Sequence, residues 1–140
     1  MSKQTTRSVE ETHALAAEFA KRLKGGELVA LVGDLGSGKT TFVRGVVEAL
    51  GSKVRVKSPT FTVMNEYPVD GNEVKRIVHV DLYRFKDPEH LKGIALDDSM
   101  RDDTVVFVEW LDIFGKIFLK PDHEVQFTFV DEETREIEIV

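Results

Sequence analysis

A glycine-rich loop constrains the fold of this chain more than any other feature of its sequence. Residues 33–41 read GDLGSGKTT, which fits the phosphate-binding pattern G-x-x-x-x-G-K-[ST] at every position. In such a loop, backbone N–H groups turn inward around phosphate oxygens, and the helix that follows adds the partial positive charge of its N-terminus. The pattern is specific only where a strand precedes it and a helix follows it.

Both flanking elements are indicated by the sequence. Leu28–Val32 is a continuous apolar run, which is typical of a parallel strand that is covered on both faces. After the loop, apolar residues mark one stripe of a helix that ends at Gly51. These residues are Phe42, Val43, Val46, Val47 and Leu50. We therefore predict a strand–loop–helix unit in which Lys39 reaches the outer phosphates and Thr40 offers its hydroxyl to Mg²⁺.

The rest of the pattern alternates helices and strands. A helix is expected over Thr12–Lys24, with Ser8 and Glu11 as a capping box and a Gly-Gly stop after it. A second helix start is expected at Asp87–Leu91. Extended segments are expected at Phe61–Val69, Lys75–Tyr83, Thr104–Trp110, Glu124–Val130 and Arg135–Val140. The expected fold class is α/β, a three-layer P-loop NTPase-type domain with a mixed, largely parallel central sheet and antiparallel hairpin additions.

Composition bounds the organisation and excludes some functions. A chain of 140 residues fits one domain, here a single P-loop domain over residues 1–140. The net charge of −6 argues against strong non-specific binding of nucleic acid, although Lys53, Arg55 and Lys57 form one dense basic cluster. The absence of cysteine excludes disulfides and thiolate metal sites. The sequence contains no signal-peptide pattern and no run of about 20 apolar residues, so we expect a cytoplasmic protein.

Two acidic residues follow apolar runs and are candidates for the metal side of the site. Asp81 comes after Ile77–Val80, and Glu109 comes after Val105–Val108. Mg²⁺ prefers oxygen ligands, and acids at the carboxyl ends of neighbouring strands supply them. Such a carboxylate can bind the metal directly, bind it through water, or orient an attacking water. The candidate catalytic residues are therefore Lys39, Asp81 and Glu109.

Two further features have both a structural and a functional interpretation. The segment Ser58-Pro-Thr-Phe-Thr62 is either a turn that enters a strand or a loop that senses the γ-phosphate through Ser58, Thr60 and Thr62. Trp110 is either a core residue or a neighbour of the nucleotide. The histidines show no metal-ligand spacing and are interpreted as structural or surface residues. They are His13, His79, His90 and His123.

Four motifs in this order resemble the TsaE family, the small P-loop ATPases of bacterial tRNA threonylcarbamoylation. The motifs are GDLGSGKTTFVRG, VKSPTFTVMNEY, HVDLYRFKDPEHLKGI and VEWL, and the similarity runs from about Val9 to Arg135. The resemblance implies Mg²⁺-dependent ATP binding and slow ATP hydrolysis. It also implies that the protein acts on a complex of TsaB and TsaD, which modifies the tRNA adenosine beside the anticodon. In that case tRNA is contacted only indirectly, no membrane is involved, and the isolated protein is expected to be a monomer.

The resemblance also implies roles for particular residues. Thr40, Asp81 and Glu109 would lie on the metal side, Trp110 would lie near the nucleotide, and Arg84 would contact either phosphate or a partner protein. The implied nucleotide-binding residues are Val9, Leu35, Gly36, Ser37, Gly38, Lys39, Thr40, Thr41 and Arg135. Two positions depart from the family pattern without touching a residue of assigned role. Ser37 stands where alanine is common, and Leu111 stands where proline often follows the tryptophan.

Three alternatives to a regulatory ATPase were weighed. A small-molecule kinase needs an acceptor pocket and an arginine-bearing lid, and after Glu109 the chain offers only Arg135 with Lys116 and Lys120. A nucleotide switch that does not hydrolyse ATP is disfavoured by the presence of both strand-end acids. A tRNA-binding adaptor would depend on the basic cluster at residues 53–57 and is disfavoured by the overall acidity.

Overall fold

The strands of this protein form one sheet in which parallel pairing occupies the centre. The computed structural model describes residues 2–34, 37–52, 64–71, 73–81, 101–109 and 121–140. Within these residues the strands are β1 (Ser2–Thr6), β2 (Leu28–Val32), β3 (Met64–Pro68), β4 (Arg76–Asp81), β5 (Thr104–Glu109), β6 (His123–Phe129) and β7 (Arg135–Ile139). Their order across the seven-stranded sheet is β1-β7-β6-β2-β5-β4-β3.

The direction of the strands divides the sheet into a centre and two margins. The neighbours β6, β2, β5 and β4 run parallel to one another. At one margin β3 pairs antiparallel with β4, and at the other β7 pairs antiparallel with β6, followed by β1 on β7. The expected mixed α/β fold is confirmed, and both expected hairpins are present.

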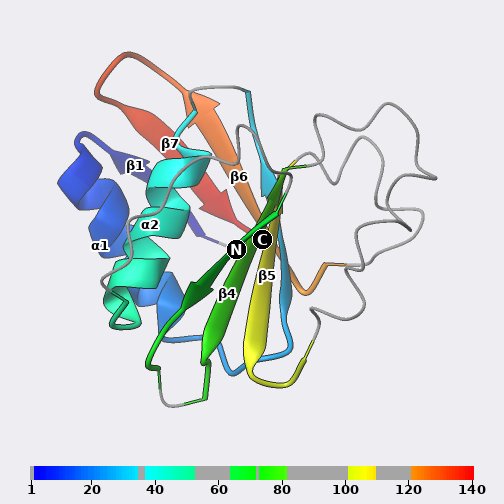
Figure 1. Cartoon of the computed structure of the whole chain (residues 1–140). Coiled ribbons are helices and arrows are strands. Elements are labelled where there is room, and N and C mark those ends of the chain that lie inside the picture. Colours follow the sequence, from blue (N-terminus) through cyan, green and yellow to red (C-terminus); the bar gives the residue numbers. More distant parts are fainter. Residues whose placement is uncertain (1, 35–36, 53–63, 72, 82–100, 110–120) are drawn as a thin grey trace.

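Two helices lie together on one face of the sheet (Figure 1). Helix α1 spans Val9–Ala20 and helix α2 spans Lys39–Ala49. Ser8 caps α1 by accepting a hydrogen bond from the Glu11 N–H, as its position before the helix predicts. The helix begins three residues before the expected Thr12 and ends before Lys24, because the cap at Ser8 determines where it starts.

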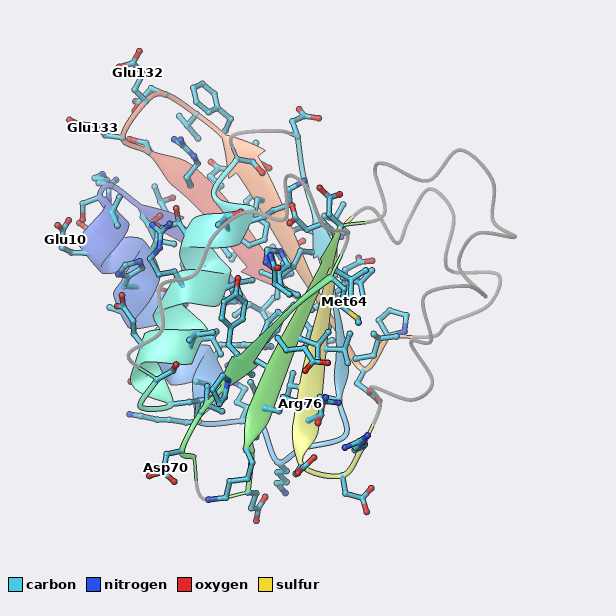
Figure 2. All side chains as sticks on the ribbon, in the orientation of Figure 1. Glu10, Met64, Asp70, Arg76, Glu132 and Glu133 are labelled. Carbon is cyan, nitrogen blue, oxygen red and sulfur yellow. The ribbon has the colours of Figure 1, made fainter. Side chains whose placement is uncertain are left out.

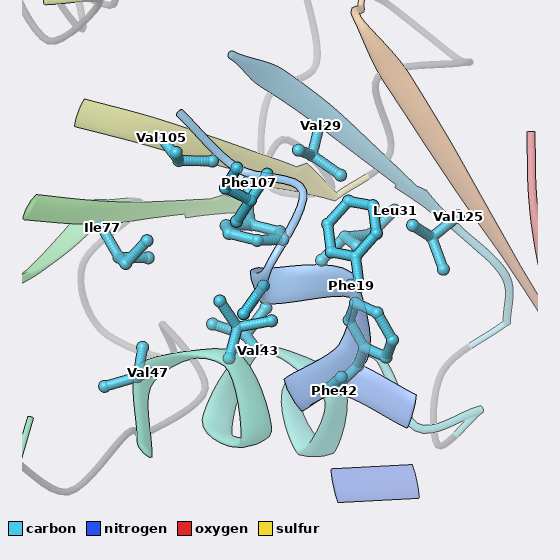
Figure 3. Close-up of a cluster of buried hydrophobic side chains, with 14 of the residues drawn as sticks. Phe19, Val29, Leu31, Phe42, Val43, Val47, Ile77, Val105, Phe107 and Val125 are labelled. Carbon is cyan, nitrogen blue, oxygen red and sulfur yellow. The ribbon is translucent and has the colours of Figure 1, made fainter. Parts of the chain in front are cut away.

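The apolar core lies between these helices and the sheet. Phe19 of α1 and Phe42 of α2 have ring centroids 5.6 Å apart, and Phe19 packs edge-on to Phe107 of the sheet (Figure 3). Phe42 packs edge-on to Phe127 of β6. Each buried aromatic ring of this kind contributes about 2 kcal/mol through the area removed from water. The opposite face of the central strands is buried as well. Its residues include Leu28, Ala30, Val78, Val80, Val106 and Val108.

Strand β1 is the one described element that sequence analysis did not predict. Its residues Ser2–Thr6 are polar and carry no strand pattern that favours a buried face. The strand forms because it pairs along its whole length with β7, in the register Thr6 opposite Arg135. The Thr6 and Thr12 hydroxyls, 2.8 Å apart, then link β1 to the first turn of α1.

The remaining elements differ from expectation only at their ends. Residues 61–63, 82, 83 and 110, expected in strands, and the expected helix start at residues 87–91 lie outside the described residues. Strand β6 begins at His123, and both β6 and β7 end one residue before the expected positions. Within the described residues, neither helix is long and apolar enough to cross a membrane.

Candidate functional site

The glycine-rich loop lies between the carboxyl end of β2 and the start of α2. Gly38 is the N-cap of α2 and has φ +106°, a left-handed backbone conformation that favours glycine. No side chain caps this helix end. The first N–H groups of an α-helix have no partner within the helix, so the start of α2 offers donors to an anion.

Ser37 supplies a further observation that fits a phosphate ligand. Its side chain is buried, yet among the described residues its hydroxyl has no hydrogen-bond partner. A buried hydroxyl without a partner is unfavourable, and an oxygen-rich ligand in the loop would satisfy it. Leu35 and Gly36, the other residues expected here, lie outside the described residues.

Lys39 is held inside the loop by contacts with oxygen atoms. Its side chain is only 4% exposed, and its Nζ donates to the Gly33 carbonyl oxygen at 2.6 Å. The same Nζ lies 3.6 Å from Glu109 Oε1. A buried ammonium group needs such partners, because burial without them costs several kcal/mol. The lysine therefore lies where the expected phosphates would be, paired with a carboxylate from β5.

The strand order brings both predicted acids to the end of the sheet where this loop begins. Strand β5 lies between β2 and β4, and Asp81 and Glu109 are directly paired across β4 and β5. Glu109 also pairs with Leu31, two residues before the loop. Because paired residues on parallel strands share a face of the sheet, both carboxylates lie on the face that carries α2.

His79 joins this group, although sequence analysis interpreted it as structural. The imidazole is fully buried, and its Nε2 lies 2.6 Å from Glu109 Oε2. The two-residue period of a strand places His79 on the same face as Asp81, but its contact with Glu109 depends on the pairing of β4 with β5. Lys39, Glu109 and His79 therefore form one buried chain of polar contacts.

The oxygen donors at this end of the sheet fit Mg²⁺. Thr40 is adjacent to Lys39 and half-buried, and Asp81 and Glu109 supply carboxylates on neighbouring strands. Within the described residues, no three or more His, Cys, Asp or Glu side chains are grouped as a metal site. This agrees with the usual binding of Mg²⁺ in nucleotide sites, where one or two carboxylates act together with substrate phosphates.

A cavity of about 320 Å³ opens beside the loop. It contains two residues that sequence analysis placed near the nucleotide, Val9 at the start of α1 and Arg135 at the start of β7. Gly38 and Thr41 form its border with the loop. The other lining residues are Arg7, Ser8, Glu10, Thr12, Glu132 and Glu133. Figure 2 shows Glu10, Glu132 and Glu133 at the same end of the molecule.

Arg135 is fixed by contacts within the β6–β7 hairpin. Its guanidinium carbon lies 4.6 Å from the centroid of the Phe129 ring, and its Nη1 donates to the Thr134 and Asp131 carbonyl oxygens. The Asp131 carboxylate accepts from the N–H groups of Glu133 and Thr134, both at 2.9 Å. These hydrogen bonds, the one from the Glu133 N–H above all, lower the pKa of Asp131.

Five of the sequence-predicted site residues beyond the loop are not placed. Ser58, Thr60, Thr62, Arg84 and Trp110 lie outside the described residues. Sequence analysis did not single out Arg7 or Phe129, which lie in or beside the cavity because β1 pairs with β7.

The parallel centre, the strand–loop–helix unit and the acid-bearing strand beside it together define a P-loop-type α/β domain. The sequence profile of the family described as "Threonylcarbamoyl adenosine biosynthesis protein TsaE" matches residues 6–137. The chain therefore belongs to the TsaE family, as its motifs predict.

Individual relatives agree with this assignment. The chain is 39% identical over 113 residues to the tRNA threonylcarbamoyladenosine biosynthesis protein TsaE of Haemophilus influenzae, covering 81% of this chain and 69% of that protein. It is 37% identical over 128 residues to the protein of the same name in Bacillus subtilis, covering 91% and 78%. The crystal structure of Bacillus subtilis YdiB superposes with a TM-score of 0.73 at 31% identity, covering 97% of this chain and 82% of that chain.

Proposed function

We propose that this protein binds ATP and hydrolyses it slowly, and that it supports turnover of a TsaB–TsaD complex that threonylcarbamoylates tRNA. The observation that carries the proposal is the contact between Lys39 and Glu109, 3.6 Å apart at the ends of adjacent elements. Lys39 belongs to a phosphate-binding motif, and Glu109 is the acid at the end of β5, the strand beside β2. A P-loop ATPase requires this combination.

The residues of the loop have complementary roles in this proposal. The N-terminus of α2 and the Ser37 hydroxyl bind phosphate oxygens, and Lys39 leaves Glu109 to contact the outer phosphates. Thr40 and Glu109 would hold Mg²⁺ with support from Asp81, directly or through water. Bound Mg²⁺ would neutralise charge on the phosphates. Glu109 or Asp81 orients the attacking water, so water is the phosphoryl acceptor.

The cavity beside Gly38 accommodates the nucleoside part of the ligand. Val9 is 52% exposed and offers an apolar surface to a base or ribose. The Arg135 side chain lies beside Gly38, with its Cγ 3.7 Å from the position that a Cβ would occupy there. This supports Val9 and Arg135 as nucleotide contacts.

Membership of the TsaE family supports a proposal about where the protein works and how it reaches tRNA. A subunit that acts on a tRNA-modifying complex works in the cytoplasm and reaches tRNA through TsaB and TsaD. Because the protein serves the complex, we expect a low rate of ATP hydrolysis by the isolated protein and stimulation by the two partners.

Steady-state ATP hydrolysis, measured for the protein alone and with TsaB and TsaD, tests this proposal. A rate that rises several-fold with the pair, requires Mg²⁺ and is lost in Glu109→Gln supports it. Lys39→Ala and Arg135→Ala should weaken binding of a fluorescent ADP analogue, whereas Glu109→Gln should lose hydrolysis more than binding. Glu136→Gln, which changes an exposed carboxylate on β7, is the matched control.

Two outcomes would redirect the proposal. Tight ATP binding without hydrolysis under any condition would favour a nucleotide switch. ADP release that depends on a small-molecule acceptor and phosphorylates that acceptor would favour a kinase.

A further inference from the structure

His79 occupies a position that packing alone does not explain. It lies in β4 between Val78 and Val80 and is fully buried. Its Nε2 contacts Glu109 Oε2 at 2.6 Å, while among the described residues its Nδ1 has no hydrogen-bond partner. A buried nitrogen without a partner is unfavourable, and an apolar residue in the same space would avoid that cost. The contact with Glu109 is therefore the feature that a histidine provides here.

The contact with Glu109 fits one tautomer of His79. An ionised carboxylate accepts hydrogen bonds and cannot donate them, so the tautomer with the proton on Nε2 is the one that pairs with an ionised Glu109. A hydrogen bond to a charged acceptor is short and strong, and it restricts the rotation of the carboxylate. Glu109 is thus held by one of its two oxygens.

The two oxygens of Glu109 consequently face different partners. Oε2 contacts His79 Nε2, whereas Oε1 lies 3.6 Å from the ammonium group of Lys39, the residue before Thr40. We infer that His79 is a positioning residue: it holds Oε2 so that Oε1 stays directed at the phosphate and Mg²⁺ side of the site. This inference rests on the proposed function. Partners that orient a metal-binding carboxylate commonly contribute about 10- to 100-fold to metal affinity.

The test compares nucleotide affinity with and without Mg²⁺ in variants of this one side chain. A fluorescent ADP analogue is titrated into wild type, His79→Leu and His79→Gln, first with Mg²⁺ and then with EDTA. In His79→Leu we expect the Mg²⁺-dependent gain in affinity to fall about 10-fold, with binding in EDTA unchanged. His79→Gln can still donate a hydrogen bond from its side-chain amide, so it should recover most of that gain.

His123 provides a matched control. It begins β6, which β2 and β5 separate from β4, and packs edge-on to Phe19. His123→Leu and His123→Gln should leave the Mg²⁺ dependence at the wild-type value. Thermal melting of all variants shows whether a change reflects loss of folding, because a folding defect would weaken binding in EDTA as well.

A spectroscopic measurement without nucleotide tests the contact itself. In proton NMR, the His79 Nε2 proton should resonate far downfield and disappear from that region in Glu109→Leu. A His79→Leu variant with wild-type Mg²⁺ dependence would overturn the inference and leave the proposed function standing. Failure of the wild type to bind nucleotide at all would overturn both.

Discussion

Removing the carboxylate of Glu109 should destabilise the protein before any nucleotide is added. Lys39 and Glu109 are both at least 94% buried, so Glu109→Leu removes a carboxylate that lies 3.6 Å from a buried ammonium group. Breaking one partner of a buried ion pair costs about 3–5 kcal/mol, and the lower end applies because Lys39 keeps the Gly33 carbonyl. Unfolding entropy for 140 residues is about 0.3 kcal/mol/K, so about 3 kcal/mol lowers the Tm by about 10 °C.

A double-mutant cycle separates this effect from general damage. Lys39→Met should be destabilising too, because it leaves Glu109 buried with His79 as its remaining partner. The double variant Lys39→Met/Glu109→Leu removes both charges, so it should recover about 2 kcal/mol of the summed single losses. The unpaired His79 should account for about 1 kcal/mol of the loss that remains. Urea unfolding at pH 7 measures all four proteins.

An exposed ion pair in the same protein supplies the control. Lys3 and Glu136 lie 3.4 Å apart across β1 and β7, with side chains 62% and 37% exposed. The same cycle there should give a coupling below about 1 kcal/mol. A Glu109→Leu variant with the wild-type Tm, or a buried coupling no larger than the exposed one, would refute this account of the site.

Three further variants test other parts of the structure. Ser37→Ala should raise the free energy of unfolding by about 1 kcal/mol in urea titrations without nucleotide, since it removes a buried hydroxyl without a partner; a loss of stability would show that this hydroxyl has one. Gly45→Ala should cost about 1 kcal/mol on the same assay despite better helix propensity, because the new Cβ would lie 2.7 Å from the Ala16 Cβ; a gain would mean that the helices separate easily. Because the folded pKa of Asp131 is lowered, its carboxylate stabilises the folded state at pH values above the unfolded pKa of about 3.9. This stabilisation is lost as the pH falls through the lower folded pKa. Asp131→Asn should therefore be less stable than wild type at pH 7, with the difference closing as the pH falls through the lowered folded pKa; a constant difference would exclude this linkage.

The sequence was sufficient where one local pattern determines one element. The continuous apolar run of β2 predicts a parallel strand that is covered on both faces, and that of β5 predicts another buried strand. The apolar run of β4 predicts an extended segment in a hairpin with β3, which the structure confirms. The ends of the β4 and β5 runs located Asp81 and Glu109, which the structure pairs directly across β4 and β5. The motif at residues 33–41 likewise located Lys39. The structure places this lysine in contact with Glu109.

Sequence reasoning failed where distant segments determine the environment of a residue. Strand β1 has no apolar pattern of its own and exists through its pairing with β7. The contact of His79 with Glu109 depends on the pairing of β4 with β5, which a pattern within β4 does not reveal. Val9 and Arg135 were placed at the nucleotide by family resemblance alone, and only the folded chain shows them in one cavity.

Residues from both ends of the described chain line the cavity beside the loop. Arg7 and Val9 come from one end and Glu132 and Arg135 from the other, and the β1–β7 pairing brings them together. A ribosome releases the N-terminal segment first, so a nascent chain carries a finished GKTT motif before it has a finished pocket. Contacts between such distant segments also form slowly. The phosphate-binding loop can therefore form before the cavity does. The cavity is complete only after β7 has emerged from the ribosome.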